Sequence, residues 1–166
     1  IFKRNLVKMK AKLKDVGLKE FEITGKKYWA AEHPQHKGYW PTTCGNVIST
    51  NSSYNGQGES TRGNSKPRLL IRQSNKKNRY LRVSICTDKG RSEQLVHRLV
   101  AQTYLEAPDD DLRDWDIPRP REDVNHIDGN PRNNKIANLE WNSRKENLEH
   151  NKRLKAIKEE AKELYV

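Results

Sequence analysis

A segment near the C-terminal end of the chain most restricts how the protein can fold. Residues 123–127 and 139–142 have the composition of short strands, and the aspartate, glycine and asparagines between them favour a turn. Ser143 follows the second strand directly, and Glu146 stands three residues later, which is the spacing of a capping box at a helix N-terminus. The pattern predicts a β-β-α unit whose helix begins at Ser143 and continues as an exposed helix rich in Lys and Glu.

A second unit is predicted over residues 66–107. Residues 69–73 and 80–87 are interpreted as two strands joined by the basic turn 74–78, which would make a β-hairpin. Residues 95–105 have apolar side chains at helical spacing, so we expect a helix that covers the apolar face of the hairpin.

The remaining segments carry weaker signals. Apolar spacing among the lysines of residues 3–18 predicts a short basic helix, and residues 28–49 are interpreted as short strands or turns around a small aromatic cluster. Residues 50–65 are almost entirely Asn, Ser, Gly and Thr, which predicts a loop, and the prolines and acids of residues 108–123 predict a surface connection. We therefore expect three regions with the boundaries 1–65, 66–107 and 108–166.

The charge of the chain indicates the class of its partner. Hydrophobic residues make up 33% of the sequence and charged residues another 33%, with a formal net charge of +11, so phosphate backbones should be attracted to it. No run approaches the roughly 20 apolar residues of a membrane-spanning helix, so we expect no membrane partner. The density of basic residues on or near the predicted hairpin favours contact with DNA, through Lys66, Arg68, Arg72, Lys76, Lys77, Arg79 and Arg82.

The β-β-α segment also carries a run of polar residues at defined spacing. Val124-Asn125-His126-Ile127-Asp128-Gly129-Asn130 is followed by Asn133-Asn134, by Asn138-Leu139-Glu140-Trp141 and by Glu146-Asn147. These residues resemble the HNH endonucleases of phages and intron homing elements. The resemblance covers roughly residues 66–150 and, more weakly, residues 28–49.

The resemblance implies both a fold and an activity. The expected fold is α+β, with a small ββα-metal (His-Me finger) nuclease unit preceded by a basic β-hairpin and helix that bind DNA. The expected activity is metal-dependent hydrolysis of phosphodiester bonds in double-stranded DNA, leaving 5′-phosphate and 3′-hydroxyl ends. One such unit in a monomer predicts nicking of one strand, and a double-strand break would require a dimer or a second event.

Two residues of the segment suit the activation of water. His126 lies on the first predicted strand, and a neutral imidazole with a pKa of roughly 6.5 can accept a proton from water near neutral pH. Asn138, just before the second strand, is interpreted as the residue whose side-chain carbonyl holds one imidazole nitrogen and orients the ring.

Three further residues are candidates for binding one divalent metal, Mg²⁺ or Mn²⁺. Asn147 lies in the first turn of the capped helix and offers an amide oxygen to a hard cation. His150 lies three residues later on the same helix face and is a second candidate. Asn125 precedes His126, so side-chain alternation places it on the opposite strand face, and in relatives this position is often Asp. With Asn at position 125, these candidate metal ligands include no carboxylate, so we expect them to bind the cation more weakly.

Other interpretations of the same residues remain open. The polar residues of the turn, Asn134 included, are interpreted as turn formers, and His97 as a histidine packed on its helix. The chain could be a DNA-binding phage protein that keeps the fold but has little nuclease activity, or an RNA-binding protein, for which only Tyr80 is well placed. We expect the protein to work in the cytoplasm of a bacterial or phage-infected cell, since no signal peptide is visible.

Overall fold

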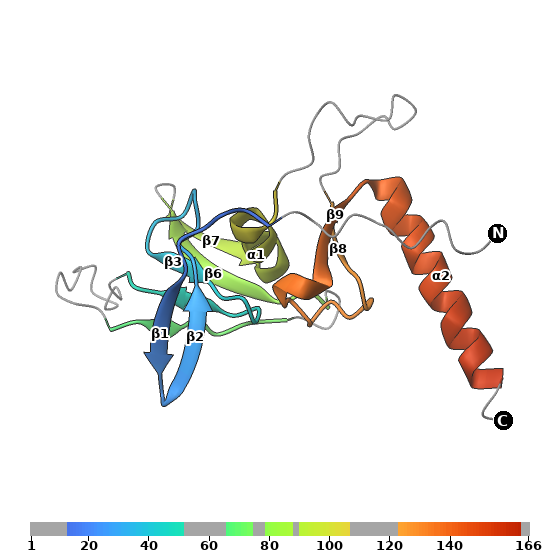
Figure 1. Ribbon diagram of the computed structural model, residues 1–166, viewed down its shortest axis with the longest axis horizontal. Helices are drawn as coiled ribbons and strands as arrows, with labels where there is room; N and C mark the ends of the chain where they lie inside the picture. The colour runs from blue at the N-terminus through green and yellow to red at the C-terminus, as the bar shows by residue number, and fades with distance from the viewer. Residues whose placement is uncertain (1–12, 52–65, 75–78, 88–89, 107–122, 164–166) are drawn as a thin grey trace.

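The computed structural model describes residues 13–51, 66–74, 79–87, 90–106 and 123–163, shown in colour in Figure 1. Within these ranges the chain forms four small antiparallel sheets and two α-helices. The strands are β1 (Lys19–Ile23), β2 (Lys26–Ala30), β3 (Tyr39–Pro41), β4 (Val47–Ser49), β5 (Arg68–Leu69), β6 (Arg82–Thr87), β7 (Gly90–Leu95), β8 (Asp123–His126) and β9 (Leu139–Asn142). The helices are α1 (Val96–Tyr104) and α2 (Arg144–Glu163), with a short 3₁₀ turn at Ile136–Asn138. The expected α+β class is confirmed.

The predicted N-terminal helix is wrong where it can be compared. Residues 1–12 lie outside the described residues, but residues 13–18 are not helical. Leu13 forms a β-bridge with Leu105, and the backbone N–H of Lys14 donates to the carbonyl of Tyr104 over 2.8 Å. The backbone of this segment therefore bonds to the end of α1, and these long-range partners replace the local bonds of a helix.

The strands of the second region pair with different strands from those predicted. β6 pairs with β7, a polar strand that lacks apolar alternation, whereas β5 pairs with β4 in the sheet order β3-β4-β5. The predicted pairing of residues 69–73 with residues 80–87 is reduced to an isolated bridge between Gln73 and Arg82. Leu69 pairs instead with the fully buried Ile48 of β4. Burial against β4 thus determines the partner of β5.

The main core lies where α1 covers β6. Val96, Leu99 and Val100 are almost fully buried on one face of the helix, as the apolar spacing predicts, and they pack with Val83 and Ile85 of β6. Residues of β8 and β9 join the same core from the other side. Figure 1 accordingly shows α1 between the β6–β7 hairpin and the β8–β9 ribbon. A second, smaller cluster is formed by Phe21, Ala30 and Ile48, with Trp40 edge-on to Phe21.

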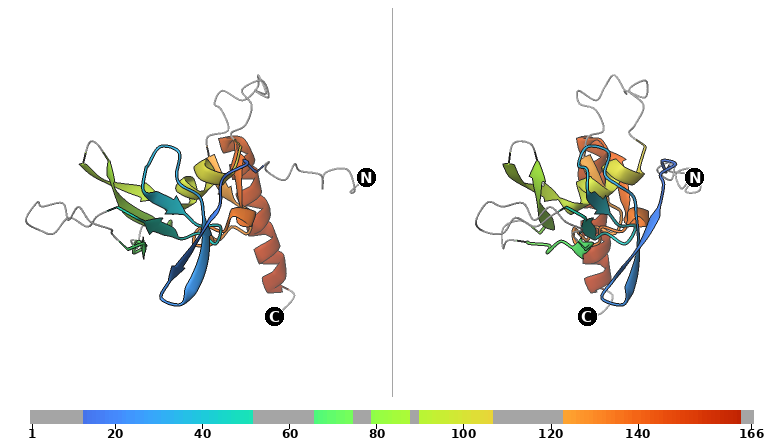
Figure 2. Two further views of the ribbon diagram at one scale, coloured as in Figure 1. Left: turned by 60° about the vertical axis from the view of Figure 1, so that its left-hand side comes forward. Right: turned by 90° about the vertical axis from the view of Figure 1, so that its left-hand side faces the viewer.

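The β-β-α unit forms as the sequence predicts. β8 and β9 are antiparallel, and the capping box closes through the backbone N–H of Ser143, which donates to Glu146 Oε2 over 2.9 Å. In return, the backbone N–H of Glu146 donates to Ser143 Oγ over 3.3 Å. The helix that follows runs away from the body of the molecule (Figures 1 and 2), and its side chains from residue 151 to 160 are exposed except Leu154.

The turn between β3 and β4 docks on the loop between β8 and β9. Gly45 has a φ of +85°, and a Cβ added to it would lie 2.6 Å from the carbonyl carbon of Asn134. Beside this contact, the backbone N–H of Ile136 donates to the carbonyl of Thr43 over 3.2 Å. The close approach requires glycine at position 45 for both its conformation and its lack of a side chain.

Replacing Gly45 with Ala should therefore destabilise the fold by about 1–3 kcal/mol, because the new methyl group meets backbone atoms and the residue is held at positive φ. Thermal and denaturant unfolding measure the effect. The matched control is Gly17→Ala, where a Cβ would meet no atom within 4 Å. Equal melting temperatures for the two variants would contradict the docking contact.

Candidate active site

His126 ends β8 and is almost completely buried, with 5% of its surface exposed. Its Nε2 lies 2.9 Å from Oδ1 of Asn134. A carbonyl oxygen can only accept a hydrogen bond, so Nε2 carries the proton and Nδ1 carries the lone pair. Burial lowers the pKa of His126 below 6.5, and this effect outweighs the hydrogen bond from the ring to Asn134, which raises it. The ring is therefore neutral at neutral pH and can accept a proton at Nδ1.

Asn138 does not make the contact predicted for it. Its Oδ1 accepts from the backbone N–H of Asp128 over 3.0 Å, and its Nδ2 donates to Asp128 Oδ1 over 2.9 Å and to the carbonyl of Asn133 over 2.8 Å. All its side-chain hydrogen bonds are thus used to close the turn after β8. The residue that holds His126 is Asn134, which was interpreted only as a turn former.

The turn itself is organised around the carboxylate of Asp128. Burial acts to raise the pKa of Asp128, but hydrogen bonds from the Asn133 side chain, the Asn130 backbone and the Asn138 side chain outweigh it and hold the pKa below its ordinary value. Because the backbone N–H of Ile127 also donates to the Asn138 carbonyl over 2.9 Å, the chain just after His126 is fixed at both its backbone and its side chains.

Two rings from the preceding region lie against His126. The ring centroid of His97 on α1 is 5.1 Å from that of His126, and the Tyr80 ring lies 4.8 Å from His97 and 5.8 Å from His126. Burial lowers the pKa of His97 to about 3, so this ring is neutral and adds no charge to the site. His97 is buried on α1 as expected, although its Nδ1 has no hydrogen-bond partner in the described structure. Its ring also forms part of the wall that removes water from His126.

On the other face of the β8–β9 ribbon, Asn125 and His150 come together. Nδ2 of Asn125 lies 3.3 Å from Nδ1 of His150, which α2 brings over the ribbon. The same Nδ2 donates to Oε1 of Glu140 over 3.0 Å. Glu140 stands opposite Asn125 in the strand register and was not among the residues selected from the sequence. Opposite residues of an antiparallel pair share a face, so the register alone would have identified Glu140.

Asn147 is half-buried in the first turn of α2, and its Oδ1 accepts from Asn151 Nδ2 over 3.3 Å. Its side chain makes no hydrogen bond to Asn125 or His150 in the described part of the chain. The two candidate halves of the site lie on opposite faces of the ribbon, since His126 pairs with Leu139 and Asn125 pairs with Glu140.

The donor set on the Asn125 face suits a hard divalent cation. Both hydrogens of the Asn125 amide have acceptors, in Glu140 and His150, which leaves the amide oxygen as the atom available to a cation. Amide and carboxylate oxygens are the ligands that Mg²⁺ prefers. Over the described ranges no three His, Cys, Asp or Glu side chains gather at one place, so a metal here depends on amide oxygens as well.

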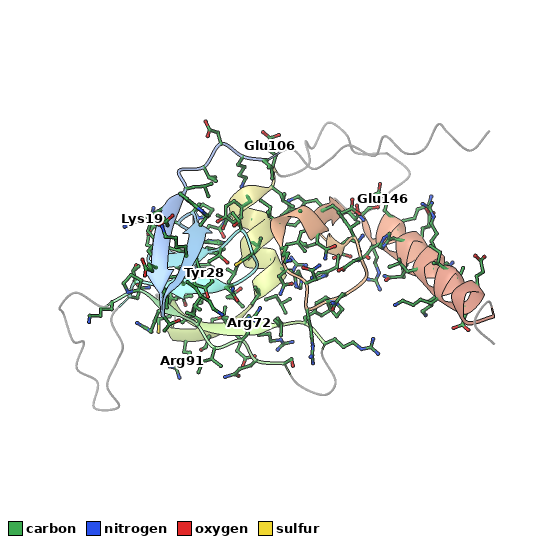
Figure 3. The ribbon with its side chains drawn as sticks, turned by 60° about the horizontal axis from the view of Figure 1, so that its bottom comes forward. Lys19, Tyr28, Arg72, Arg91, Glu106 and Glu146 are labelled. Carbon is green, nitrogen blue, oxygen red and sulfur yellow. The ribbon has the colours of Figure 1, made fainter. Side chains whose placement is uncertain are left out.

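The basic residues predicted to contact DNA are divided between two sheets. Arg68 donates to the carbonyl of Asn51 over 2.6 Å, and Arg82 pairs with Glu93 over 3.2 Å. Lys76 and Lys77 lie outside the described residues. The remaining three have exposed side chains: Lys66, Arg72 and Arg79. Figure 3 shows Arg72 and Arg91 on the side of the body opposite to Glu106.

Comparison with known proteins identifies the segment that holds these residues. The sequence profile of a family described as HNH endonuclease matches residues 116–149. An uncharacterized HNH endonuclease of Acanthamoeba polyphaga mimivirus is 45% identical over 71 residues, which is 43% of this chain and 18% of the relative. A putative HNH homing endonuclease from the SPbeta prophage of Bacillus subtilis is 45% identical over 62 residues, which is 37% of this chain and 30% of the relative.

Among solved structures, the HNH homing endonuclease I-HmuI, described for its binding and cleavage of DNA, matches 72% of this chain and 55% of its own chain. The sequence identity is 26% and the TM-score 0.49. The chain spans less than a third of the length of the curated relatives it matches. In the described ranges no helix is long and apolar enough to cross a membrane. The resemblance found in the sequence is confirmed: residues 116–149 match the profile of the HNH endonuclease family, and parts of the chain are 45% identical to proteins described as HNH endonucleases.

Proposed function

We propose that the chain is a metal-dependent DNA endonuclease that hydrolyses phosphodiester bonds in double-stranded DNA and nicks one strand per active site. The observation that supports this most directly is the state of His126. It is buried, neutral and held at Nε2 by Asn134, inside the segment that matches the HNH endonucleases. These are the properties that a general base needs.

In the proposed reaction, Nδ1 of His126 takes a proton from a water molecule as the water oxygen attacks phosphorus. The bond from phosphorus to the 3′ oxygen breaks, and that oxygen takes a proton from a second, solvent water, which leaves a 3′-hydroxyl and a 5′-phosphate. Asn134 keeps the proton on Nε2, so the lone pair of Nδ1 stays available. His97 and Tyr80 shield the ring from bulk water and hold its orientation.

A divalent cation, Mg²⁺ or Mn²⁺, would supply charge neutralisation at the phosphate when bound. The residues proposed to hold it are Asn125 through its free amide oxygen and Asn147 from the first turn of α2. His150 contributes by holding Asn125. Asn138 is proposed to act on His126 indirectly, by closing the turn around Asp128.

Conversion of supercoiled plasmid to the nicked circle in the presence of Mg²⁺ tests the proposal. The wild-type protein should nick the plasmid and lose this activity in EDTA. His126→Ala should lower the rate about 10²- to 10⁴-fold, the usual contribution of a general base.

The control for this substitution is His36→Ala, which removes a histidine that stacks on His33 away from the site and should leave nicking unchanged. Nicking by His126→Ala at the wild-type rate would show that His126 is not the general base. Nicking that persists in EDTA would show that the reaction does not need a divalent metal.

The same assay tests whether Asn134 orients His126. Asn134→Ala should slow nicking about 10- to 100-fold, because His126 loses its orienting partner, and Asn134→Asp should recover most of the rate, because the carboxylate still accepts from Nε2. Unfolding curves of both variants provide the structural control. If Asn134→Asp were as slow as Asn134→Ala at equal stability, the orienting bond would not be the cause.

We propose that the protein acts as a monomer on duplex DNA in the cytoplasm of a bacterial or phage-infected cell. Its DNA contacts can be tested by binding measurements. Arg72 and Arg79 are proposed to contact phosphates because both side chains are exposed, together with the other basic residues predicted above.

Replacing either Arg72 or Arg79 with Gln should weaken duplex binding for all sequences alike and reduce the slope of log K against log salt by about one. Fluorescence anisotropy in EDTA, at several salt concentrations, measures both quantities. Arg153→Gln is the matched control, because Arg153 is paired with Glu149 on α2 over 3.8 Å. Unchanged slopes of log K against log salt for both arginine variants would show that Arg72 and Arg79 do not contact phosphates.

A further inference from the structure

Glu140 carries a carboxylate that is hydrogen-bonded directly to Asn125, one of the proposed metal ligands. Its Oε1 accepts hydrogen bonds from Nδ2 of Asn125 and Nδ2 of Asn142, each over 3.0 Å. Its second oxygen, Oε2, has no hydrogen bond within the described ranges, and the side chain is half-buried rather than free in water. The carboxylate is therefore held in one place by one oxygen while the other stays available.

The charge of Glu140 is not balanced by a basic side chain in the described structure. Asp123, on the same face of the ribbon, pairs with Arg98 over 3.8 Å, but no Lys or Arg of the described residues forms an ion pair with Glu140. Its two recorded partners are neutral amides. The two amides stabilise Oε1, and a cation beside the half-buried carboxylate would add a positive charge at Oε2, which has no hydrogen-bond donor in the described structure.

Glu140 also determines which atom Asn125 presents. Since Glu140 and His150 accept the two amide hydrogens, the Asn125 oxygen is the amide atom that has no hydrogen-bond partner in the described structure. His150 uses Nδ1 for this contact, so in this arrangement its Nδ1 orients Asn125 and is not a ligand. One oxygen of Asn125 and one oxygen of Glu140 thus remain available on the same face of the ribbon.

We propose that Glu140 binds the divalent cation together with Asn125 and supplies the formal negative charge that Asn at position 125 lacks. The proposal rests on the metal dependence proposed above. In place of an acidic residue at position 125 of β8, the charge lies directly across the ribbon on β9, in the register Asn125↔Glu140. The metal half of the site therefore has its carboxylate on the neighbouring strand.

Binding of Mn²⁺ to the full chain, measured by calorimetric titration and by the electron paramagnetic resonance signal of free Mn²⁺, tests this assignment without using nuclease activity. Glu140→Gln keeps an oxygen that accepts from Asn125 and Asn142 but removes the charge. It should weaken Mn²⁺ binding about 10- to 100-fold. The matched control is Glu149→Gln, which makes the same change of charge on α2 next to Arg153 and should leave the affinity unchanged.

A double variant that exchanges the two side-chain groups makes the test independent of the folding of Glu140→Gln alone. Asn125→Asp combined with Glu140→Gln moves the carboxylate across the ribbon and keeps an amide opposite a carboxylate, so it should recover most of the wild-type affinity. Recovery would support a charge requirement at this pair even if Glu140→Gln alone proved poorly folded.

Equal Mn²⁺ affinity of wild type and Glu140→Gln, with both folded by circular dichroism, would overturn the role of Glu140 and leave the nuclease proposal standing. Failure of the exchanged pair to bind, although folded, would overturn it as well. If the wild type bound no Mn²⁺, this inference and the metal dependence would both fall, and plasmid nicking in EDTA would then show whether the nuclease proposal falls with them.

Discussion

The structure depends on the burial of one face of α1. Two-stranded sheets are marginally stable in water by themselves, and the β6–β7 and β8–β9 pairs are each two-stranded. α1 allows both to persist because its apolar face packs on β6, while residues of β8 and β9 join the same core. The backbone of residues 13–14 bonds to the end of this helix as well. With 33% hydrophobic residues, the chain concentrates its limited apolar surface around this helix.

This core places the candidate base as well as supporting the fold. His97 lies on α1 among the core residues, and its ring contacts His126. The packing that holds β8 to α1 therefore also removes water from His126 and lowers its pKa. On the opposite face of the ribbon the polar residues face α2, so the two strands separate the candidate base from the cluster of Asn125, Glu140 and His150.

The asparagines of the turn show why residue type alone is an incomplete guide. Asn130, Asn133, Asn134 and Asn138 carry the same amide group within nine residues of the sequence. Asn138 faces the Asp128 carboxylate, while Asn134 is buried under the Gly45 turn with its oxygen toward His126. The distinction comes from a contact with the β3–β4 turn, about 90 residues earlier in the chain, and no local spacing rule includes such a contact.

Sequence alone determined the features that depend on neighbours within a few residues. The capping box of α2, the strands β8 and β9 and the apolar face of α1 all follow from such local patterns, and so does the position of His126 at the end of β8. The family resemblance has the same origin, because its motif lies within residues 116–149.

Only the tertiary structure decided which segments pair and which side chains meet. β6 pairs with the polar β7, β5 pairs with β4, and residues 13–18 give up a helix for bonds to the end of α1. The partner of His126 and the nearness of Glu140 to Asn125 were decided in the same way. The physical reason is that strand pairing and side-chain contact depend on burial shared between distant parts of the chain, whereas turns, caps and helical faces depend on bonds between near neighbours.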